Sequence, residues 1–402
     1  MGSLALVNGT GLASNYSLNS ASLNITKRVL NSSGSKTYDA NTDALAGAIT
    51  LSNLVSGEAL NHSGTATISS ANAGSYTITN LSGISIADGS GGTASNYTLT
   101  GGTHNFTVNR RAVSVSGTRL YDATTNAVAS DLSTHANLVG SETLNLSGTG
   151  TIASKNVGSN KTVSVGTLAL ADGSNGGLAA NYTLSGGTHQ LTVNQRPLNA
   201  TLARQYDGTT TAAGSDLSSF DALQGGETLT MTGSGTAASA NVANGIAMSS
   251  NGTLALADGT GLASNYSLNS TVINIAQRVL NSSGSKTYDA NTDALAGAIT
   301  LSNLVSGEAL NHSGTATISS ANAGSYTITN LSGISIADGS GGTASNYTLT
   351  GGTHNFTVNR RAVSVSGTRL YDATTNAVAS DLSTHANLVG SETLNLSGTG
   401  TI

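Results

Sequence analysis

The sequence is poor in the residues that usually define a reactive site or cross-link a fold. Its 402 residues include no cysteine, no tryptophan, one proline and only 9% charged residues. Without cysteine there is no disulfide and no thiolate metal site. No apolar run approaches the roughly 20 residues of a membrane helix, so no membrane span is expected. The net charge of −5 provides no basic stripe to neutralise phosphates, which disfavours nucleic acid as a partner.

The chain instead contains a long repeat, marked by two recurring pairs of residues. A period of roughly 83 residues indicates an array of repeated units and outweighs the other sequence signals. The first pair is a tyrosine-aspartate corner, found at Tyr38-Asp39, Tyr121-Asp122, Tyr206-Asp207, Tyr288-Asp289 and Tyr371-Asp372. The second is an asparagine-tyrosine pair, whose tyrosines are Tyr16, Tyr97, Tyr182, Tyr266 and Tyr347.

A basic or glutamine-arginine pair recurs with the same period and predicts where one repeat ends and the next begins. These pairs are Lys27-Arg28, Arg110-Arg111, Gln195-Arg196, Gln277-Arg278 and Arg360-Arg361. They predict complete repeats at 28–110, 111–195, 196–277 and 278–360, the C-terminal part of a repeat at 1–27 and the N-terminal part of another at 361–402. Residues 28–152 also recur without change at 278–402. The chain is therefore expected to be a window cut from a longer array.

Apolar residues within each repeat alternate with polar ones at a period of two, as in Val113-Ser114-Val115. This alternation indicates half-buried strands. The predicted fold is all-β: a tandem array of small β-sandwich-like or β-grasp-like domains, each with six to eight short strands, forming an elongated rod. The alternative is a continuous β-solenoid with coils of roughly 21 residues, although no self-similarity at that length is visible.

Two local features are expected within the β-structure. Glycine pairs before the last strand of a repeat are expected to form tight hairpin turns with positive φ. These pairs are Gly101-Gly102, Gly186-Gly187 and Gly351-Gly352. A single helical turn is expected near Asp131-Leu132-Ser133 and its equivalents.

The tyrosines and aspartates of the recurring pairs are the candidate site residues, and they are interpreted first as structural. In a chain with three phenylalanines and no tryptophan, the tyrosines are expected to fill the cores, with their hydroxyls on polar partners. The alternative is a row of aromatic platforms that stack on sugars. The aspartates are expected to accept backbone N–H groups in Asx-type turns. Their alternative is a calcium site between domains.

No spacing of residues predicts catalysis, a cofactor or a metal centre. The seven histidines are isolated, and there is no H-E-x-x-H pattern and no G-x-S-x-G elbow. A catalytic constellation would also gain nothing from being copied unchanged along one chain. The basic boundary pairs are expected to cover the seam between neighbouring repeats. The alternative for them is a patch that binds anionic polysaccharide.

These residues resemble the YDG-type repeats of very large bacterial surface proteins. The clearest match runs Arg196, Tyr206-Asp207-Gly208-Thr209-Thr210, Gly226-Glu227 and Asn265-Tyr266, whereas the other four copies read Tyr-Asp-Ala. Such repeats are similar to those of filamentous-haemagglutinin-like adhesins exported by two-partner secretion. The resemblance implies a shaft of tandem β domains between a cell-anchored end and a distal binding region.

The expected function is therefore a non-enzymatic stalk in an adhesin at the bacterial cell surface, outside the outer membrane, serving adhesion, aggregation or biofilm formation. The expected partners are neighbouring repeats in the same chain, with extracellular polysaccharide or cell-surface glycans reached through the parent protein. The alternative function is that the repeats themselves bind polysaccharide or associate with one another between cells.

Overall fold

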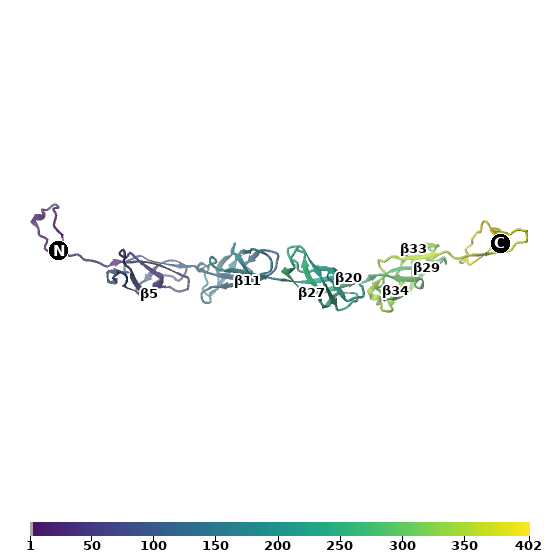
Figure 1. Ribbon diagram of the computed structural model, residues 1–402, viewed down its shortest axis with the longest axis horizontal. Coiled ribbons are helices and arrows are strands. Elements are labelled where there is room, and N and C mark those ends of the chain that lie inside the picture. The colour runs from purple at the N-terminus through teal and green to yellow at the C-terminus, as the bar shows by residue number, and fades with distance from the viewer. Residues whose placement is uncertain (1–2) are drawn as a thin grey trace. The chain divides into compact units, whose positions relative to one another are not determined.

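The computed structural model describes residues 3–402, so the first two residues of the predicted partial repeat 1–27 lie outside it. Within these residues the regular structure consists of β-strands and three-residue 3-10 helices. The strands of each complete repeat gather around their own sheet (Figure 1). This confirms the prediction of tandem β domains. The alternative, one continuous β-solenoid, is wrong because each large sheet contains strands of a single repeat only. Residues 1–194 and 195–402 form two units, each described by itself.

The first unit contains two complete repeats. The strands of its first repeat are β1 (Arg28–Val29), β2 (Asn31–Thr37), β3 (Asp43–Leu45), β4 (Ile49–Ser52), β5 (Leu60–Ile68), β6 (Gly74–Asn80), β7 (Ile84–Asp88), β8 (Tyr97–Thr98) and β9 (His104–Asn109). Those of its second repeat are β10 (Arg111–Ala112), β11 (Ser114–Leu120), β12 (Asn126–Val128), β13 (Thr134–Ala136), β14 (Leu144–Ser147), β15 (Thr149–Ile152), β16 (Gly158–Ser164), β17 (Ala169–Asp172), β18 (Tyr182–Thr183) and β19 (His189–Asn194).

The second unit contains two further complete repeats and the segment 361–402. Its third repeat has β20 (Arg196–Gln205), β21 (Thr211–Ala213), β22 (Leu217–Phe220), β23 (Leu229–Thr232), β24 (Ser234–Ala237), β25 (Ala243–Ser250), β26 (Ala255–Asp258) and β27 (Tyr266–Ala276). The fourth has β28 (Arg278–Val279), β29 (Asn281–Thr287), β30 (Asp293–Leu295), β31 (Ile299–Ser302), β32 (Leu310–Ile318), β33 (Gly324–Asn330), β34 (Ile334–Asp338), β35 (Tyr347–Thr348) and β36 (His354–Asn359). The segment 361–402 has β37 (Ser364–Ser366), β38 (Asn376–Val378), β39 (Thr384–Ala386) and β40 (Thr399–Thr401).

One strand order recurs in all four complete repeats. In the first repeat it is β3-β5-β6-β9-β2-β4, and in the second it is β12-β15-β16-β19-β11-β13. The long strand near the start of the repeat pairs in parallel with the last strand, as β2 does with β9 and β20 with β27. Because these two strands run the same way, the chain enters a repeat at one end and leaves it at the opposite end.

The strand number was underestimated. The first, second and fourth repeats contain nine, ten and nine strands rather than six to eight, because in these repeats a two-residue strand at the start, such as β1, and another before the last strand, such as β8, form a separate parallel pair. In the third repeat these short strands merge into β20 and β27, which leaves eight.

The glycine pairs have the predicted backbone but not the predicted connection. Gly101, Gly186 and Gly351 have φ between 81° and 89°. The strands on either side do not form a hairpin, since β8 pairs with β1 and β9 lies between β2 and β6. The turn instead carries the chain from the small sheet into the large one. It passes so close to Leu30 that a Cβ on Gly102 would lie 1.9 Å from the Leu30 carbonyl oxygen.

Short 3-10 helices occur at two positions in the repeat. One precedes each Asn-Tyr tyrosine: η1 (Ala13–Asn15), η3 (Ala94–Asn96), η5 (Ala179–Asn181), η7 (Ala263–Asn265) and η9 (Ala344–Asn346). The other follows the third strand or its equivalent: η2 (Ala46–Ala48), η4 (Ala129–Asp131), η6 (Gly214–Asp216), η8 (Ala296–Ala298) and η10 (Ala379–Asp381). The helical turn expected near Asp131 is thus present and ends at that residue.

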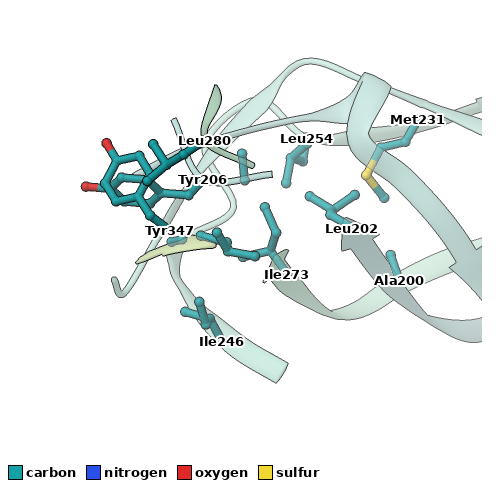
Figure 2. Packing of buried hydrophobic residues seen from close by; sticks show 12 residues of the cluster. Ala200, Leu202, Tyr206, Met231, Ile246, Leu254, Ile273, Leu280 and Tyr347 are labelled. Atoms are coloured by element: carbon teal, nitrogen blue, oxygen red, sulfur yellow. The ribbon is translucent and has the colours of Figure 1, made fainter. Parts of the chain in front are cut away.

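Small aliphatic residues and tyrosines build the cores. In the third repeat Leu202 and Ile273 from the central strands pack with Met231 and Leu254 (Figure 2). Further residues of the same cluster come from the fourth repeat, among them Leu280. The core of one repeat therefore continues into the next, and the residues at that continuation form the candidate site.

Candidate functional site: the joint between repeats

The tyrosine-aspartate corner ends the long strand of each repeat. The carboxylate of Asp122 accepts the backbone N–H of Thr124 at 2.9 Å, which closes the expected Asx turn. The residue between them lies in the left-handed region, with φ of 63° at Ala123 and 77° at Gly208. Four of the five copies thus have alanine in a left-handed backbone conformation that glycine adopts without steric penalty.

A basic residue three positions before each aspartate forms an ion pair that the sequence interpretation missed. The N–O distance is 2.8 Å for Lys36 with Asp39 and for Lys286 with Asp289, and 2.7 Å for Arg369 with Asp372; Arg119 with Asp122 and Arg204 with Asp207 pair in the same way. The Asp372 carboxylate also accepts the backbone N–H of Thr374, and this hydrogen bond lowers the pKa of Asp372. The five aspartate carboxylates of the corners therefore find their partners within their own turns.

The tyrosine of the corner reaches the following repeat. In the first unit the Tyr38 hydroxyl donates to Glu142 Oε1 at 2.7 Å, and the Tyr182 hydroxyl donates to Glu142 Oε2 at 2.6 Å. The two tyrosine rings meet edge to face, with centroids 5.4 Å apart. One carboxylate thus connects a tyrosine of the first repeat with a tyrosine of the second. Burial, together with the bond to Glu142, raises the pKa of both tyrosines to about 12.

Two further residues of the second repeat, Arg111 and Asn181, form hydrogen bonds at the same boundary. Arg111 Nη1 donates to the Tyr38 carbonyl at 3.3 Å, and its Nε donates to the Asn137 carbonyl at 2.7 Å. The Asn181 side chain accepts the Ala73 N–H at 2.8 Å and donates to the Asn72 side chain at 3.0 Å. We call this set of contacts the joint. It connects the corner of one repeat with the glutamate, the Asn-Tyr pair and the first arginine of the next repeat.

The same joint recurs inside the second unit. Tyr206 and Tyr347 both donate to Glu308 at 2.7 Å, and their rings meet edge to face at 5.4 Å. Figure 2 shows these two rings side by side at the edge of the core, with both hydroxyls pointing the same way. Asn346 accepts the Val242 N–H at 2.9 Å, and Arg278 donates to the Tyr206 carbonyl at 3.4 Å.

The structure places the other candidate tyrosines in related positions. Tyr97 donates to Glu58 and Tyr266 donates to Glu227, both inside one repeat, while Tyr288 donates to Glu392. Seven tyrosines are buried: Tyr38, Tyr97, Tyr121, Tyr182, Tyr206, Tyr266 and Tyr347. These rings lie in the cores, and buried rings are not available as sugar platforms. Tyr16 and Tyr371, in the partial repeats 1–27 and 361–402, are 71% and 93% exposed.

The glutamates are the part of the site that sequence reasoning missed. Each lies 39 or 40 residues before the tyrosine that it binds, in all four complete repeats. That constant separation was visible in the sequence and is the signal that identifies them. The interpretation of the boundary arginines as seam residues agrees with the bonds of Arg111 and Arg278 to the preceding repeat.

Other polar groups are used structurally. The His104 ring lies between Ser32 Oγ at 2.9 Å and the Leu99 carbonyl at 2.8 Å, and His354 repeats this arrangement. Residues 3–402 contain no group of three or more histidine, aspartate or glutamate side chains placed to hold a metal ion. Over the same residues no helix is long and apolar enough to cross a membrane.

Fold and site together define a class of protein: a chain of small β domains in which a shared carboxylate connects the tyrosines of neighbouring domains. Comparison with known families gives this class a name. The YDG domain matches residues 21–105, 103–190, 189–273 and 276–355. The chain therefore belongs to the YDG-domain family and carries four copies of the domain. No curated protein matches it in sequence.

Proposed function

We propose that the chain is a structural stalk, a spacer segment of a bacterial cell-surface adhesin that projects a distal binding region. The observation that carries the proposal is the repeated joint. In each unit, the chain leaves one repeat at the end opposite to where it entered, and a half-buried hydrogen-bond network then holds the next repeat. A domain with this connection adds length with every copy.

The chemistry of the joint suits a passive, load-bearing role. Its groups are hydrogen-bonded to one another, as in the bonds of Glu142 to two tyrosines. We therefore propose a non-enzymatic protein, located outside the cell and associated with the outer membrane, consistent with export by two-partner secretion and a role in adhesion or biofilm formation. Glycan binding is assigned to the parent protein and not to the repeats, because seven of their tyrosines are buried.

Small-angle X-ray scattering of the 402-residue chain, extrapolated to infinite dilution, tests the stalk. A compact chain of this length has a radius of gyration of about 21 Å. Four repeats placed end to end, each about 33 Å long from strands of about ten residues, require a maximum dimension above ~130 Å. A radius of gyration near the compact value would contradict the stalk.

A matched variant shows whether the joints hold this length. Glu308→Ala removes the shared carboxylate and leaves the core strands β29 and β36 unchanged. We expect a broader distribution of dimensions in the variant, with the same secondary structure by circular dichroism. Identical scattering from the two proteins would mean that the joint does not set the spacing.

A further inference from the structure

The strand registers allow one position in the core to be compared across the four complete repeats. A residue of the long strand near the start of each repeat pairs with a residue of the last strand on one side and with a residue of an edge strand on the other. Directly paired residues point to the same face of a sheet, so the three form a row. From the last strand to the edge strand, the rows are His104–Ser32–Leu51, His189–Val115–His135, Thr271–Ala200–Phe220 and His354–Ser282–Leu301. The row of the second repeat thus contains two histidines.

In the first and fourth repeats the central serine is a partner that suits both charge states of the histidine. Ser32 Oγ lies 2.9 Å from His104 Nδ1, and Ser282 Oγ lies 2.8 Å from His354 Nδ1. The other ring nitrogen, Nε2, donates to a backbone carbonyl, which for His104 is that of Leu99 at 2.8 Å. A hydroxyl donates to a neutral ring and accepts from a protonated one, so both bonds of the ring survive protonation.

The second repeat has valine in place of this serine, and the backbone takes over the contact. The Val115 N–H donates to His189 Nδ1 at 3.4 Å, while His189 Nε2 donates to the Leu184 carbonyl at 2.9 Å. In the first repeat the equivalent N–H, that of Ser32, donates to the Thr103 carbonyl instead. A backbone N–H cannot become an acceptor, so a proton on Nδ1 would set two donors against each other. His189, which is 6% exposed, therefore keeps this bond only as a neutral ring.

His135 occupies the edge-strand position of the same row. Its Nε2 is buried without a hydrogen-bond partner, and burial lowers the pKa of the ring. The equivalent residues of the first and fourth repeats are Leu51 and Leu301, which carry no ionisable group. Protonation of His135 would place a charged N–H in the core without an acceptor, which is a costly arrangement.

The ionisable side chains on the elements packed against this row are bonded elsewhere. With the partner of each in parentheses, they are Arg119 of β11 (Asp122), Asp131 of η4 (Val128 N–H), Lys161 of β16 (Ser154 carbonyl), Asp172 of β17 (Ala179 N–H), and Tyr182 of β18 with Glu142 (each other). Neither histidine ring forms an ion pair within the described part of the chain. A positive charge on either ring therefore has no carboxylate to stabilise it.

We propose that this row makes the second repeat an acid-sensitive element of the array, in which protonation of His135 and His189 separates β13, β11 and β19. The other three complete repeats stay closed under the same conditions. The third contains no histidine, and the first and fourth provide the serine hydroxyl that accepts the added proton. Acid thus opens one defined repeat and leaves its neighbours folded.

The direction and size of the response follow from His135. An unfolded histidine has a pKa of about 6.5, and burial lowers the pKa of His135 below that value. Below about pH 6.5 the opened repeat therefore binds a proton that the closed repeat does not, so stability is complete above this pH and falls as the pH decreases. Opening rises about tenfold per pH unit for one such histidine, which amounts to at least about tenfold between about pH 6.5 and about pH 5. The broken bond of His189 adds to this effect.

Hydrogen exchange of the 402-residue chain at about pH 7 and about pH 5, corrected for the intrinsic pH dependence of exchange, tests the proposal. Carboxylates remain ionised over this range, so the histidines are the groups that titrate. Peptides from residues 153–194 report β16 and β19, and peptides from residues 217–250 report the third repeat in the same sample. We expect the protection of β19 to fall at least about tenfold at the lower pH, while that of the third repeat is unchanged.

Two substitutions give the second repeat the residues that the first has in this row. His135→Leu should reduce the acid response of β19, and His135→Leu combined with Val115→Ser should abolish it. His62→Leu is the matched control, because it removes a histidine from the first repeat at a position where the second has Leu146. It should leave the response of β19 unchanged.

Two results would overturn the proposal. One is an equal loss of protection in the second and third repeats between the two pH values. The other is an acid response of His135→Leu as large as that of the parent chain, and this comparison decides the matter even where the double variant does not fold. Neither result bears on the stalk, since the scattering experiment is done at about pH 7, where His135 is neutral.

Discussion

The strongest test of the joint is to remove one hydroxyl from it and then the whole acceptor. Tyr206→Phe keeps the edge-to-face ring contact with Tyr347 and deletes only the bond to Glu308 across the joint. Glu308→Ala deletes the acceptor of both tyrosines. A hydrogen bond to a charged group contributes about 1.5–3 kcal/mol, and we take the lower value because Glu308 is half-buried.

The expected costs follow from that value. Tyr206→Phe and Glu308→Ala should each destabilise the closed joint by about 1.5 kcal/mol, because each deletes the one bond to Glu308 that crosses the joint, whereas the bond from Tyr347 to Glu308 lies inside the fourth repeat. Since about 1.4 kcal/mol corresponds to a factor of ten, the opening equilibrium should rise about tenfold in both variants. These values concern opening of the joint and not unfolding of either repeat.

Hydrogen exchange measured by mass spectrometry reports this opening at a single peptide, which contains Val242. The Val242 N–H donates to the Asn346 side chain across the joint, and residues 239–250 have no copy elsewhere in the sequence. Tyr288→Phe is the control, because it deletes the same hydroxyl from a different joint and should leave this peptide unchanged. Equal exchange in the parent chain and in Glu308→Ala would refute the reasoning, as it would mean that the carboxylate does not hold the repeats together.

Two other predictions concern the corner and the tyrosine hydroxyls. Ala123→Gly should stabilise its repeat by about 0.5–1 kcal/mol in urea denaturation, because it relieves a left-handed alanine at some cost in unfolded-chain entropy. Gly208→Ala should destabilise the protein, since its new Cβ would lie 2.9 Å from Val305 Cγ1. A destabilising Ala123→Gly or a stabilising Gly208→Ala would contradict the left-handed conformation assigned to this position. The pKa of Tyr38 and Tyr182 is raised to about 12, so their contribution to stability is complete below pH 10 and is lost as the pH rises through 12. Phenolate absorbance during an alkaline titration should show tyrosines that ionise only near pH 12. If no tyrosine ionises that late, the joint is open.

Local signals in the sequence predicted the local structure well. The two-residue alternation marked strands, and the aspartate followed by a turn residue marked the Asx turn at Asp122. The positive φ of Gly101 was predicted from the glycine pair alone. These features depend on a few neighbouring residues, which is why composition and spacing were sufficient for them.

The connections between distant strands were not predicted. The parallel pairing of β2 with β9 joins residues about 70 positions apart, and no property of either strand announces it. The hairpin expected at Gly101 was wrong for the same reason, since the nearest strand in sequence is not the partner. The role of Glu142 was missed because its two tyrosine partners belong to different repeats. Only the comparison of several copies, with the constant separation from glutamate to tyrosine, carries that information.

The duplicated sequence shows how strongly strands in this fold depend on partners. Residues 144–147 form β14 beside β17, whereas the identical residues 394–397, which lack that partner, form no strand. With the local sequence held constant, the change in structure is due to the missing neighbour. Local preference in these glycine- and serine-rich strands is therefore too weak to form the strand alone, and pairing supplies the remainder.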